Sequence, residues 1–554
     1  MKLSRMRRGR RWTAARGYRL VAIALLLLAA MAAPTSATTY YANPGDNLTT
    51  KINAMSAGDT LILNPGTYYS TMRMTSKTGD ADHWFTIRGS DAGPAIIRAT
   101  GVNNMIEFRN SSYWRLENFE LDGRDSSGAV AGSDGIKATV TTSDGNPDND
   151  WSHHLVFDGL EIHHVSNACI NTQVTVWDLT VQNCWLHDAI GSASAPGLGA
   201  YLGSPDHVQQ IINLTFRNNL IERTGGYGMQ VKAQNPRTGL TLGTTPGLEF
   251  TSWGWLIKDN VYMRTSPPAV AGRPCLLVDA APDSGVGSTD LATIEGNVVL
   301  AQTADATADY AFQLSGNIRV INNVLMNCKG ATAIRLGFHD ITYPRRVEIM
   351  NNTVFTDGST GAACLAVSGL QSGYTQIIAN NAFIRGDTTA VAVSATVLPG
   401  TIVTNNIVRG TGAIAGMTTI TTPISQIFLS TSDVPGTANL YPVAGSPLID
   451  AGSNAYATAY DFNRISRPKG AAADVGAYEV SGPANPGWPL AIAFKKIYGD
   501  ANGDGAVDVA DLLLVANSFG LSTGNPGFDS RCDFNGSGTV DVSDVLILAG
   551  TFGT

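Results

Sequence analysis

The chain is poor in charged residues and in helix-forming segments. Only 15% of its 554 residues are Asp, Glu, Lys or Arg, where about a quarter is usual in soluble domains. Glycine is abundant, with 59 residues, and no stretch after the N-terminus has a helical period long enough to cross over a sheet. Low charge, many glycines and few helix formers indicate an extended β architecture with many turns.

The sequence also lacks a CxxC pair. Its six cysteines lie far apart and mostly inside apolar segments, at Cys169, Cys184, Cys275, Cys328, Cys364 and Cys532. Disulfides are permitted in an exported protein, but isolated cysteines in apolar strands are more typical of small buried hydrophobic residues. The pattern therefore favours buried thiols.

Long apolar runs are absent except near the N-terminus. Residues 1–19 carry eight Lys or Arg and no acid, the run LVAIALLLLAAMAA follows, and small residues lead up to Ala37. This order predicts a signal peptide over residues 1–37, cleaved near Ala37, and no membrane span. Cleavage would remove eight positive charges and take the net charge from −8 to −16. We therefore expect a secreted or cell-surface protein, a monomer, with no nucleic-acid partner.

A repeat of asparagine followed by a short apolar run dominates the middle of the chain. It begins at Asn218, Asn322, Asn351, Asn380 and Asn405, with the variants DNVYMRT and GNVVLAQ between the first two. Each repeat continues into a second short strand, such as GMQVK or CLLVD. Short strands at this spacing predict a parallel β-helix. The asparagine fits a tight left-handed turn, where stacked amides can hydrogen-bond from coil to coil.

The start of this region, AGDTLILNPGTYY, predicts a turn, a strand and a turn, and NLTTKINAM before it predicts a short capping helix. It resembles the opening of the right-handed parallel β-helix proteins of the pectate-lyase-like superfamily. Residues 445–480 resemble the closing segment of such bacterial β-helices. The resemblance implies an all-β, right-handed parallel β-helix over residues 38–480. It leaves function open, because the superfamily includes lyases, hydrolases, epimerases and non-enzymatic proteins.

A Pro/Gly-rich linker over residues 481–497 leads into a duplicated acidic loop in residues 498–554. Oxygen-bearing residues recur at loop positions 1, 3, 5, 9 and 12: Asp500, Asn502, Asp504, Asp508 and Asp511, then Asp533, Asn535, Ser537, Asp541 and Asp544. A hard cation that takes six to eight oxygens needs this spacing, so we predict two calcium sites. Each loop runs into a single apolar helix.

This duplicated loop–helix resembles a type I dockerin, the module that docks secreted carbohydrate-active enzymes onto cohesin domains. The resemblance implies a small α-helical domain that calcium folds, and a possible cohesin-type partner. Val509-Ala510 and Val542-Ser543 stand where the best-known dockerins carry a Ser/Thr pair.

Apolar alternation aligns the second strands of the repeat. One inward column follows, made of Leu202, Val231, Val278, Leu314, Leu336 and Val367. The outward columns on either side are Tyr201, Gln230, Leu277, Gln313, Arg335 and Ala366, and Gly203, Lys232, Asp279, Ser315, Gly337 and Ser368. Because coils stack about 4.8 Å apart, Lys232 and Asp279 are expected to be neighbours on a polar strip. The loops that follow add Asp206-His207, Asp283 and His339-Asp340.

Such a strip suits an acidic polysaccharide, which can be broken by β-elimination. GMQVKAQ resembles the strand-borne lysine of the alginate and chondroitin lyase family, which implies Lys232 as the base. Arg273 or Arg335 would then be the acid or the neutralising cation. The predicted substrate-binding residues are Tyr201, Gln230, Gln313, His207 and His339. Calcium in the groove would use Asp279 and Asp283, with Asp206 as a further ligand.

Three alternatives stay open. Lys232 and Asp279 could form a plain surface ion pair. Asp206, Asp279 and Asp283 could furnish the two carboxylates of a glycoside hydrolase. The strip could also bind glycan without cleaving it. The pairs His153-His154 and His163-His164 have no third ligand at a zinc-like spacing in the sequence, which favours turn and surface roles for them.

Overall fold

The computed structural model describes residues 37–101, 104–139, 151–191, 197–204, 207, 211–232, 254–263, 272–279, 289–300, 310–328, 332–357, 363–432, 437–487, 499, 501, 507–522, 525–529, 532–534 and 539–552. The predicted signal peptide lies outside the described residues apart from Ala37. So do seven candidate ligands, namely Asp206, Asp283, Asp500, Asn502, Asp504, Asn535 and Ser537. No helix among the described residues is long and apolar enough to cross a bilayer.

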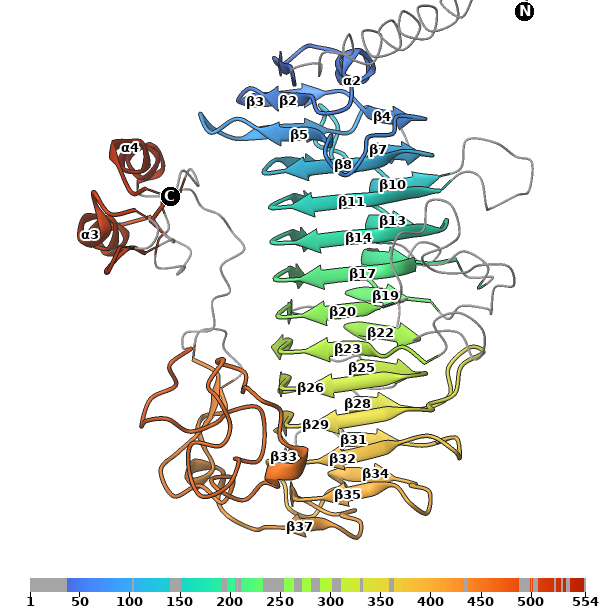
Figure 1. Cartoon of the computed structure of the whole chain (residues 1–554), viewed down its shortest axis with the longest axis vertical. Helices are drawn as coiled ribbons and strands as arrows, with labels where there is room; N and C mark the ends of the chain where they lie inside the picture. Colours follow the sequence, from blue (N-terminus) through green and yellow to red (C-terminus); the bar gives the residue numbers. More distant parts are fainter. Residues whose placement is uncertain are drawn as a thin grey trace, which may run out of the picture.

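Three long parallel sheets form the main body, and each coil contributes one strand to each sheet in turn (Figure 1). Sheet A contains β1 (Thr39–Ala42), β2 (Thr60–Leu63), β5 (Phe85–Gly89), β8 (Ser112–Glu117), β11 (Ser152–Asp158), β14 (Val176–Gln182), β17 (Ile211–Arg217), β20 (Trp255–Lys258), β23 (Ala292–Glu295), β26 (Ile318–Ile321), β29 (Val347–Met350), β32 (Gln376–Ala379) and β35 (Ile402–Thr404).

Sheet B contains β3 (Gly66–Tyr69), β6 (Ala95–Arg98), β9 (Glu120–Asp122), β12 (Glu161–His163), β15 (Trp185–His187), β18 (Leu220–Glu222), β21 (Val261–Met263), β24 (Val298–Leu300), β27 (Val324–Met326), β30 (Thr353–Thr356), β33 (Ala382–Arg385), β36 (Asn406–Arg409) and β37 (Met417–Thr419). Sheet C contains β4 (Met72–Thr75), β7 (Asn104–Arg109), β10 (Asp134–Thr139), β13 (Ala168–Thr172), β16 (Leu198–Leu202), β19 (Met229–Val231), β22 (Leu276–Asp279), β25 (Tyr310–Ser315), β28 (Thr332–Leu336), β31 (Ala363–Val367) and β34 (Val393–Ala395). The predicted parallel β-helix is confirmed.

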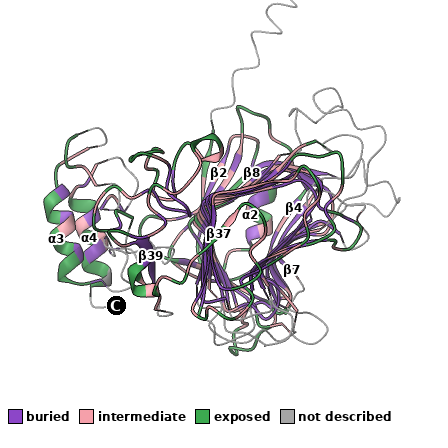
Figure 2. Cartoon of the chain, turned by 90° about the horizontal axis from the view of Figure 1, so that it is seen from below, coloured by how far each residue is buried: buried purple, intermediate pink, exposed green. Residues whose placement is uncertain are grey.

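The three sheets enclose a continuous apolar core. Seen along the axis in Figure 2, the strands surround an interior lined by buried residues. Leu202, Val231 and Val278 stack directly on one another in this core, and each is fully buried. All six cysteines are buried and unpaired with one another, as the sequence predicts. Burial raises the pKa of the Cys184 thiol to about 12, which keeps this thiol protonated.

An asparagine ladder closes the turn between sheets A and B. The side-chain amides of Asn219, Asn260, Asn297, Asn323, Asn352, Asn381 and Asn406 hydrogen-bond in series, at 2.8–3.0 Å from each Nδ2 to the next Oδ1. The residue before each ladder asparagine has a positive φ, as at Asn322 (55°) and Asn351 (54°). The repeated NN pair therefore divides two tasks that the sequence suggests for one asparagine. The first residue makes the left-handed turn and the second makes the ladder.

A short helix covers the first coil of the solenoid, and a C-terminal segment packs on its side. Helix α2 (Leu48–Ala54) packs Leu48 and Ile52 onto the first coil and is capped by Asn47, whose side chain accepts from the Thr50 amide. At the other end, the segment after β37 lies along the outer face of sheet B and contains η1 (Ile424–Gln426), η2 (Asn454–Tyr456) and the antiparallel pair β38 (Phe428–Ser430) and β39 (Asn439–Pro442). Its ion pair between Arg467 and Glu479 (3.2 Å) is almost completely buried.

The C-terminal module contains two helices, α3 (Val509–Ser518) and α4 (Val542–Thr551). Each begins with the same capping box, in which Asp508 or Asp541 is the N-cap and the acid three residues later bonds back to the N-cap amide. A small core including Val507, Val515 and Val540 joins the two halves. One helix after each acidic loop is the arrangement that the sequence predicts.

Candidate active site on sheet C

The outward face of sheet C carries the predicted polar strip. Tyr201, Gln230, Leu277, Gln313 and Arg335 pair in unbroken register along the ladder. In the adjacent column, Asp279 pairs with Ser315, and the Lys232 amide bonds to the coil before it. The first outward column therefore has the register deduced from the sequence, and the pairing of Asp279 with Ser315 agrees with the second column.

Lys232, however, pairs with a different acid from the one expected. Its Nζ donates a 2.9 Å hydrogen bond to Oδ2 of Asp340, in the loop after β28. The surface ion pair between Lys232 and Asp279, one of the alternatives left open by the sequence, is not found among the described residues, because the loop 337–343 bends back across the coils and brings Asp340 to the lysine. The Ser315 hydroxyl, which donates to the Thr342 carbonyl (2.7 Å), holds this loop against the preceding coil.

Asp279 instead holds the histidine next to Asp340. Its Oδ2 lies 2.7 Å from Nδ1 of His339. The Asp279 carboxylate is only 1% exposed, whereas the His339 side chain is 19% exposed. Oδ1 of Asp279 has no hydrogen-bond partner among the described residues. A buried carboxylate that fixes one ring nitrogen orients the imidazole, which is the usual support of a histidine that transfers protons.

Burial and neighbouring charges shift the pKa values of this group in different directions. Burial opposes the charge on Lys232, but the hydrogen bond and the charge of Asp340 outweigh it, so the pKa of Lys232 is raised. Burial also opposes the charge on Asp340, yet Lys232 lowers its pKa overall. Asp279 is the reverse case, because burial outweighs the contact with His339 and raises its pKa. The free site thus holds a lysine ammonium beside a carboxylate.

The other predicted residues lie around this group. Gln230 and Gln313 are buried on the strip. Tyr201 is half-buried, and its phenol is close enough to Lys232 to help raise the pKa of the lysine. His207 lies close enough to Asp340 for its charge to affect that carboxylate.

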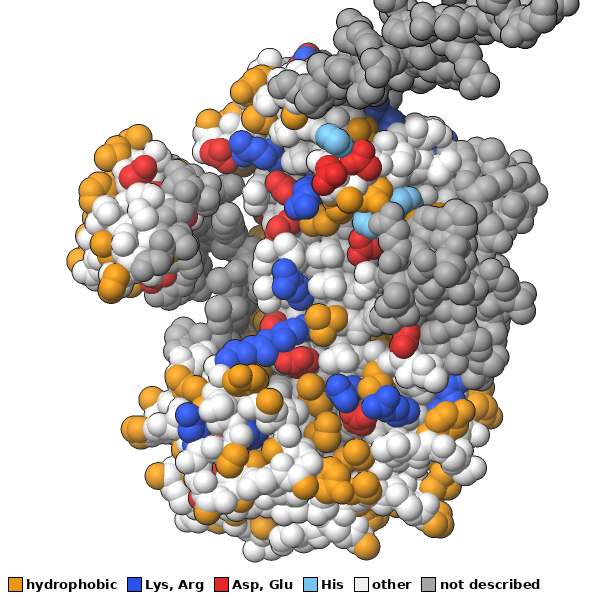
Figure 3. All heavy atoms as spheres, in the orientation of Figure 1, with side chains coloured by type: hydrophobic (Ala, Val, Ile, Leu, Met, Phe, Trp, Pro, Cys, Tyr) orange, Lys and Arg blue, Asp and Glu red, His pale blue; other side chains and the backbone are white. Residues whose placement is uncertain are grey.

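The two predicted arginines each contact a tyrosine. Arg335 is outward, with its guanidinium 5.5 Å from the ring centre of Tyr310. Arg273 donates to the hydroxyl of Tyr227 (3.1 Å), a residue that the sequence did not single out. In the view of Figure 3, charged side chains are scattered among neutral atoms.

The described donors include only part of the groove calcium site that the sequence predicts. Asp279, His339 and Asp340 each offer one ligand atom, and these atoms lie within 4.8 Å of one another. Calcium prefers oxygen ligands, whereas this set includes an imidazole, and Asp340 already bonds to Lys232. The calcium role of Asp279 stays a prediction, and Asp283 lies outside the described residues.

The C-terminal loops fit calcium better. Their position-12 acids, Asp511 and Asp544, are fully buried at the starts of α3 and α4. Asp544 accepts from the amides of Phe534 (2.8 Å) and Asp541 (2.8 Å), so its carboxylate contacts residues near both ends of the acidic loop. Asp508, Asp533 and Asp541 complete the described donors, and all of these are oxygen donors.

Comparison with known families identifies this module. Residues 498–552 match the family model of the dockerin type I domain. The C-terminal module is a dockerin type I domain. Dockerin type I domains typically bind calcium, in agreement with the two oxygen-lined loops. This family match is limited to the C-terminal end of the chain and does not include the β-helix.

Much of the chain is similar in fold to several solved enzymes. Pectate lyase Pel9A is 17% identical over 80% of this chain and 97% of its own, with a TM-score of 0.45. An alginate lyase from Paenibacillus sp. str. FPU-7 is 15% identical over 65% and 98%, with a TM-score of 0.38. The GH136 lacto-N-biosidase from Eubacterium ramulus is 11% identical over 73% and 70%, with a TM-score of 0.39. At these scores the likeness carries no argument about activity. No curated protein matches the chain in sequence.

Proposed function

We propose that the β-helix is a secreted polysaccharide lyase that cleaves an acidic, uronate-containing polysaccharide by β-elimination. The observation that carries this proposal is the cluster of Lys232, Asp279, His339 and Asp340 on the polar strip of sheet C. It places an ammonium group and an acid-oriented imidazole side by side on a face that also presents Arg335.

Elimination needs three groups at one place. A base removes the proton on the carbon next to the carboxylate, and the electron pair left behind forms a carbon–carbon double bond. The bond to the glycosidic oxygen breaks, and that oxygen takes a proton from an acid. A cation beside the carboxylate stabilises the negative charge that develops there.

The charge state of each residue suits it to one of these roles. Asp340 raises the pKa of Lys232 and so favours the ammonium form, which suits neutralisation of the substrate carboxylate. His339 is fixed through Nδ1 by Asp279, and its second ring nitrogen has no hydrogen-bond partner among the described residues, which suits proton abstraction. Lys232 as the base is the alternative assignment from the sequence. Arg273 or Arg335 remains the proposed acid or additional cation.

A glycoside hydrolase is the second candidate, for a specific reason. Asp279 and Asp340 offer carboxylate oxygens within 4.8 Å, and their pKa values shift in opposite directions, as in a retaining acid–nucleophile pair. Asp279, however, is 1% exposed and bonded to His339. A general acid must reach the glycosidic oxygen, so this burial favours the lyase.

The dockerin supports the wider setting of the proposal. We infer that the chain is exported by the N-terminal segment, that calcium folds residues 498–554, and that this module docks onto a cohesin-type scaffold. Val509, Leu513, Val542 and Leu546 on α3 and α4 are 60–67% exposed, which suits an apolar partner surface.

The test is a product assay on a panel of uronate polymers. An eliminase creates an unsaturated uronate that absorbs in the ultraviolet, and a hydrolase creates reducing ends without that absorbance. A glycan-binding protein creates neither product, so the three classes give three different results.

A further inference from the structure

A second polar cluster lies on the outer face of sheet B, whereas Lys232 and its partners belong to sheet C. Four side chains form it, from the three successive strands β9, β12 and β15: Glu120, Glu161, His163 and His187. His163 and His187 pair in register, and their rings stack in parallel, with centroids 4.7 Å apart and planes at 4°. Both histidines are 4% exposed. They are therefore not the turn and surface residues that the sequence suggests for the His163-His164 pair.

Each imidazole faces a carboxylate of the preceding coil. Nε2 of His163 lies 2.9 Å from Oε1 of Glu120, and Nε2 of His187 lies 3.1 Å from Oε1 of Glu161. One ligand atom from each of Glu161, His163 and His187 lies within 4.8 Å of the other two. The pairing of β12 with β15 thus brings His187 to Glu161 and His163, which the spacing of metal ligands along the sequence does not reveal.

The opposite ring nitrogens are held by other groups. Nδ1 of His187 lies 2.8 Å from Asp188, which Arg223 holds in turn at 2.8 Å. Nδ1 of His163 contacts Nδ1 of His164. If each Nδ1 carries the hydrogen, each Nε2 directs a lone pair at a carboxylate oxygen. Two such acceptors can face each other only with a cation between them, either a proton or a metal ion.

Support of this kind is typical of metal-binding histidines. A ligating imidazole usually donates its second N–H to a carboxylate or another acceptor, which fixes the tautomer and the ring orientation. The observed separation of 3.1 Å between Nε2 of His187 and Oε1 of Glu161 is close to the edge of about 3.4 Å that a tetrahedron with bonds of 2.0–2.1 Å requires.

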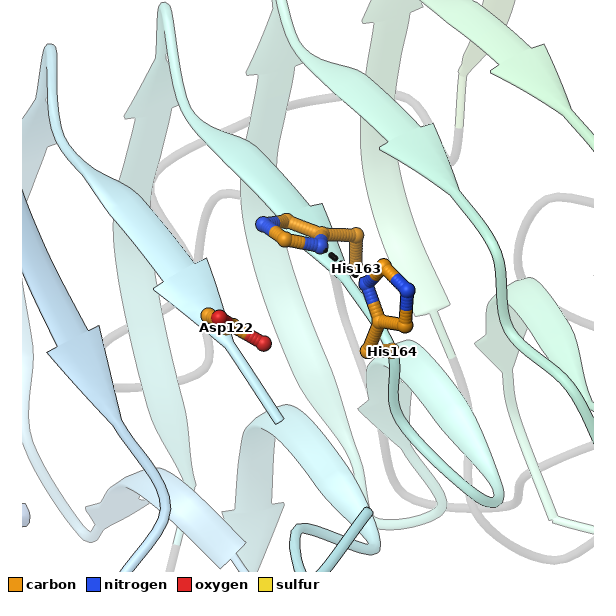
Figure 4. A group of neighbouring side chains, drawn as sticks. All are labelled: Asp122, His163 and His164. Atoms are coloured by element: carbon orange, nitrogen blue, oxygen red, sulfur yellow. Dashed lines mark hydrogen bonds between the residues drawn. The ribbon is translucent and has the colours of Figure 1, made fainter. Parts of the chain in front are cut away.

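Asp122 is excluded as a ligand, although Figure 4 shows it beside His163 and His164. Its two oxygens accept from the Arg124 backbone amide (3.0 Å), from the Arg124 guanidinium (2.8 and 2.9 Å) and from Arg98 (3.0 Å). These four donors use its lone pairs, and two arginines would repel a metal ion. The metal-binding side of His163 is therefore the Nε2 side, toward Glu120 and Glu161.

We propose that Glu161, His163 and His187 bind one divalent transition metal ion such as zinc, with water at the fourth position. The mixed nitrogen and oxygen donors suit zinc, cobalt or nickel, and they do not suit calcium, which takes six to eight oxygens. The ion would displace the proton shared by Glu161 and His187 and link β12 to β15. The most widely spaced ligand atoms, which lie up to 4.8 Å apart, would have to approach each other by about 1.4 Å to form a tetrahedral site.

The test is zinc titration of the full chain with calcium present, by calorimetry, together with the visible absorption of the cobalt(II) form. We expect one zinc ion per chain. His187→Gln and Glu161→Gln should each weaken binding by about tenfold or more, and the double variant His163→Gln/His187→Gln should lose it. The expected cobalt spectrum is that of a four-coordinate site, and it should disappear in the same variants.

Two variants serve as controls. His83→Gln alters an exposed histidine bonded to Asp80, and His339→Gln alters the other acid–histidine group on sheet C. Zinc binding should persist in both. Glu161→Gln keeps the side-chain shape, so its loss of binding would hold even if the histidine variants fold poorly. No zinc binding by the wild-type chain, full binding by Glu161→Gln, or loss of binding in His339→Gln would each overturn the site.

Discussion

Nζ of Lys232 donates a 2.9 Å hydrogen bond to Oδ2 of Asp340, a residue 108 positions further along the chain. The two residues follow β19 and β28, with β22 and β25 between those strands in sheet C. Three coil spacings amount to about 14 Å, so the loop that carries Asp340 must bend back over the strip to make this bond. The same loop brings His339 to Asp279. One loop therefore assembles the site from coils that the sequence keeps apart.

Lys232 can be tested by its charge. Lys232→Ala should lower the rate of elimination by at least about 10²-fold, because either a base or a neutralising cation is lost. Lys232→Arg keeps the charge and should retain measurable activity if Lys232 neutralises the substrate carboxylate. An inactive Lys232→Arg chain with normal thermal unfolding would instead assign the base to Lys232.

The Asp279–His339 pair gives a second prediction. His339→Gln should lower the elimination rate by about 10²–10⁴-fold, the usual contribution of a general base, and leave the far-ultraviolet circular dichroism unchanged. His83→Gln is the matched control and should behave as wild type. Wild-type rates in His339→Gln would remove this histidine from the chemistry.

The asparagine ladder should be a main source of stability. Asn352 donates to Asn381 (2.9 Å) and to the Val320 carbonyl (2.8 Å), and it accepts from the amide of Asn323 (3.0 Å). Asn352→Ala leaves buried donors and acceptors unpaired and should cost about 3 kcal/mol of unfolding free energy. Asn64→Ala removes an exposed amide contact and should cost little by comparison. Equal losses in chemical denaturation would contradict a special role for the ladder.

Glu107 should make the stability of the protein depend on pH. Burial opposes its charge, but hydrogen bonds from Arg109 (2.8 Å) and Thr139 (2.8 Å) and the charge of Arg73 outweigh burial and lower its pKa. A lowered folded-state pKa stabilises the protein above the unfolded value of about 4.3, and this contribution fades as the pH falls through the folded value. Glu107→Gln should therefore be less stable than wild type by about 2 kcal/mol at pH 7, with the difference closing in acid. A difference that is constant with pH in thermal unfolding would show that the charge is not the cause.

Calcium should control the C-terminal module alone. Chelation should unfold α3 and α4, because the buried carboxylates of Asp511 and Asp544 lose the cation that we propose for them. Asp511→Ala should have the same effect in part. Limited proteolysis should then cut the module and spare the β-helix; a module that resists the protease after chelation would contradict the calcium assignment.

Most of the fold can be predicted from the sequence. The NN repeat and the alternation of apolar residues specify the coils, and the column from Leu202 to Val367 has the register of the structure. This works because parallel coils stack residue on residue, so that a repeat in sequence becomes a row in space.

What the sequence could not show depends on loop geometry and on contacts between coils. The loop after β28 follows no repeat, so its path cannot be deduced from the sequence. The sequence alone therefore favours Asp279 as the neighbour of Lys232, although the structure shows that Asp340 bonds to it. In the same way, His187 reaches Glu161 only through the pairing of β12 with β15. A local search for metal-ligand spacing cannot find residues that meet across coils.

The lyase proposal is tested most directly by the product that the full chain forms from a panel of uronate polymers with calcium present. This proposal predicts an ultraviolet-absorbing unsaturated uronate from at least one acidic polymer with the wild-type chain, and none with Lys232→Ala. New reducing ends without ultraviolet absorbance, or no product from any polymer, would contradict it.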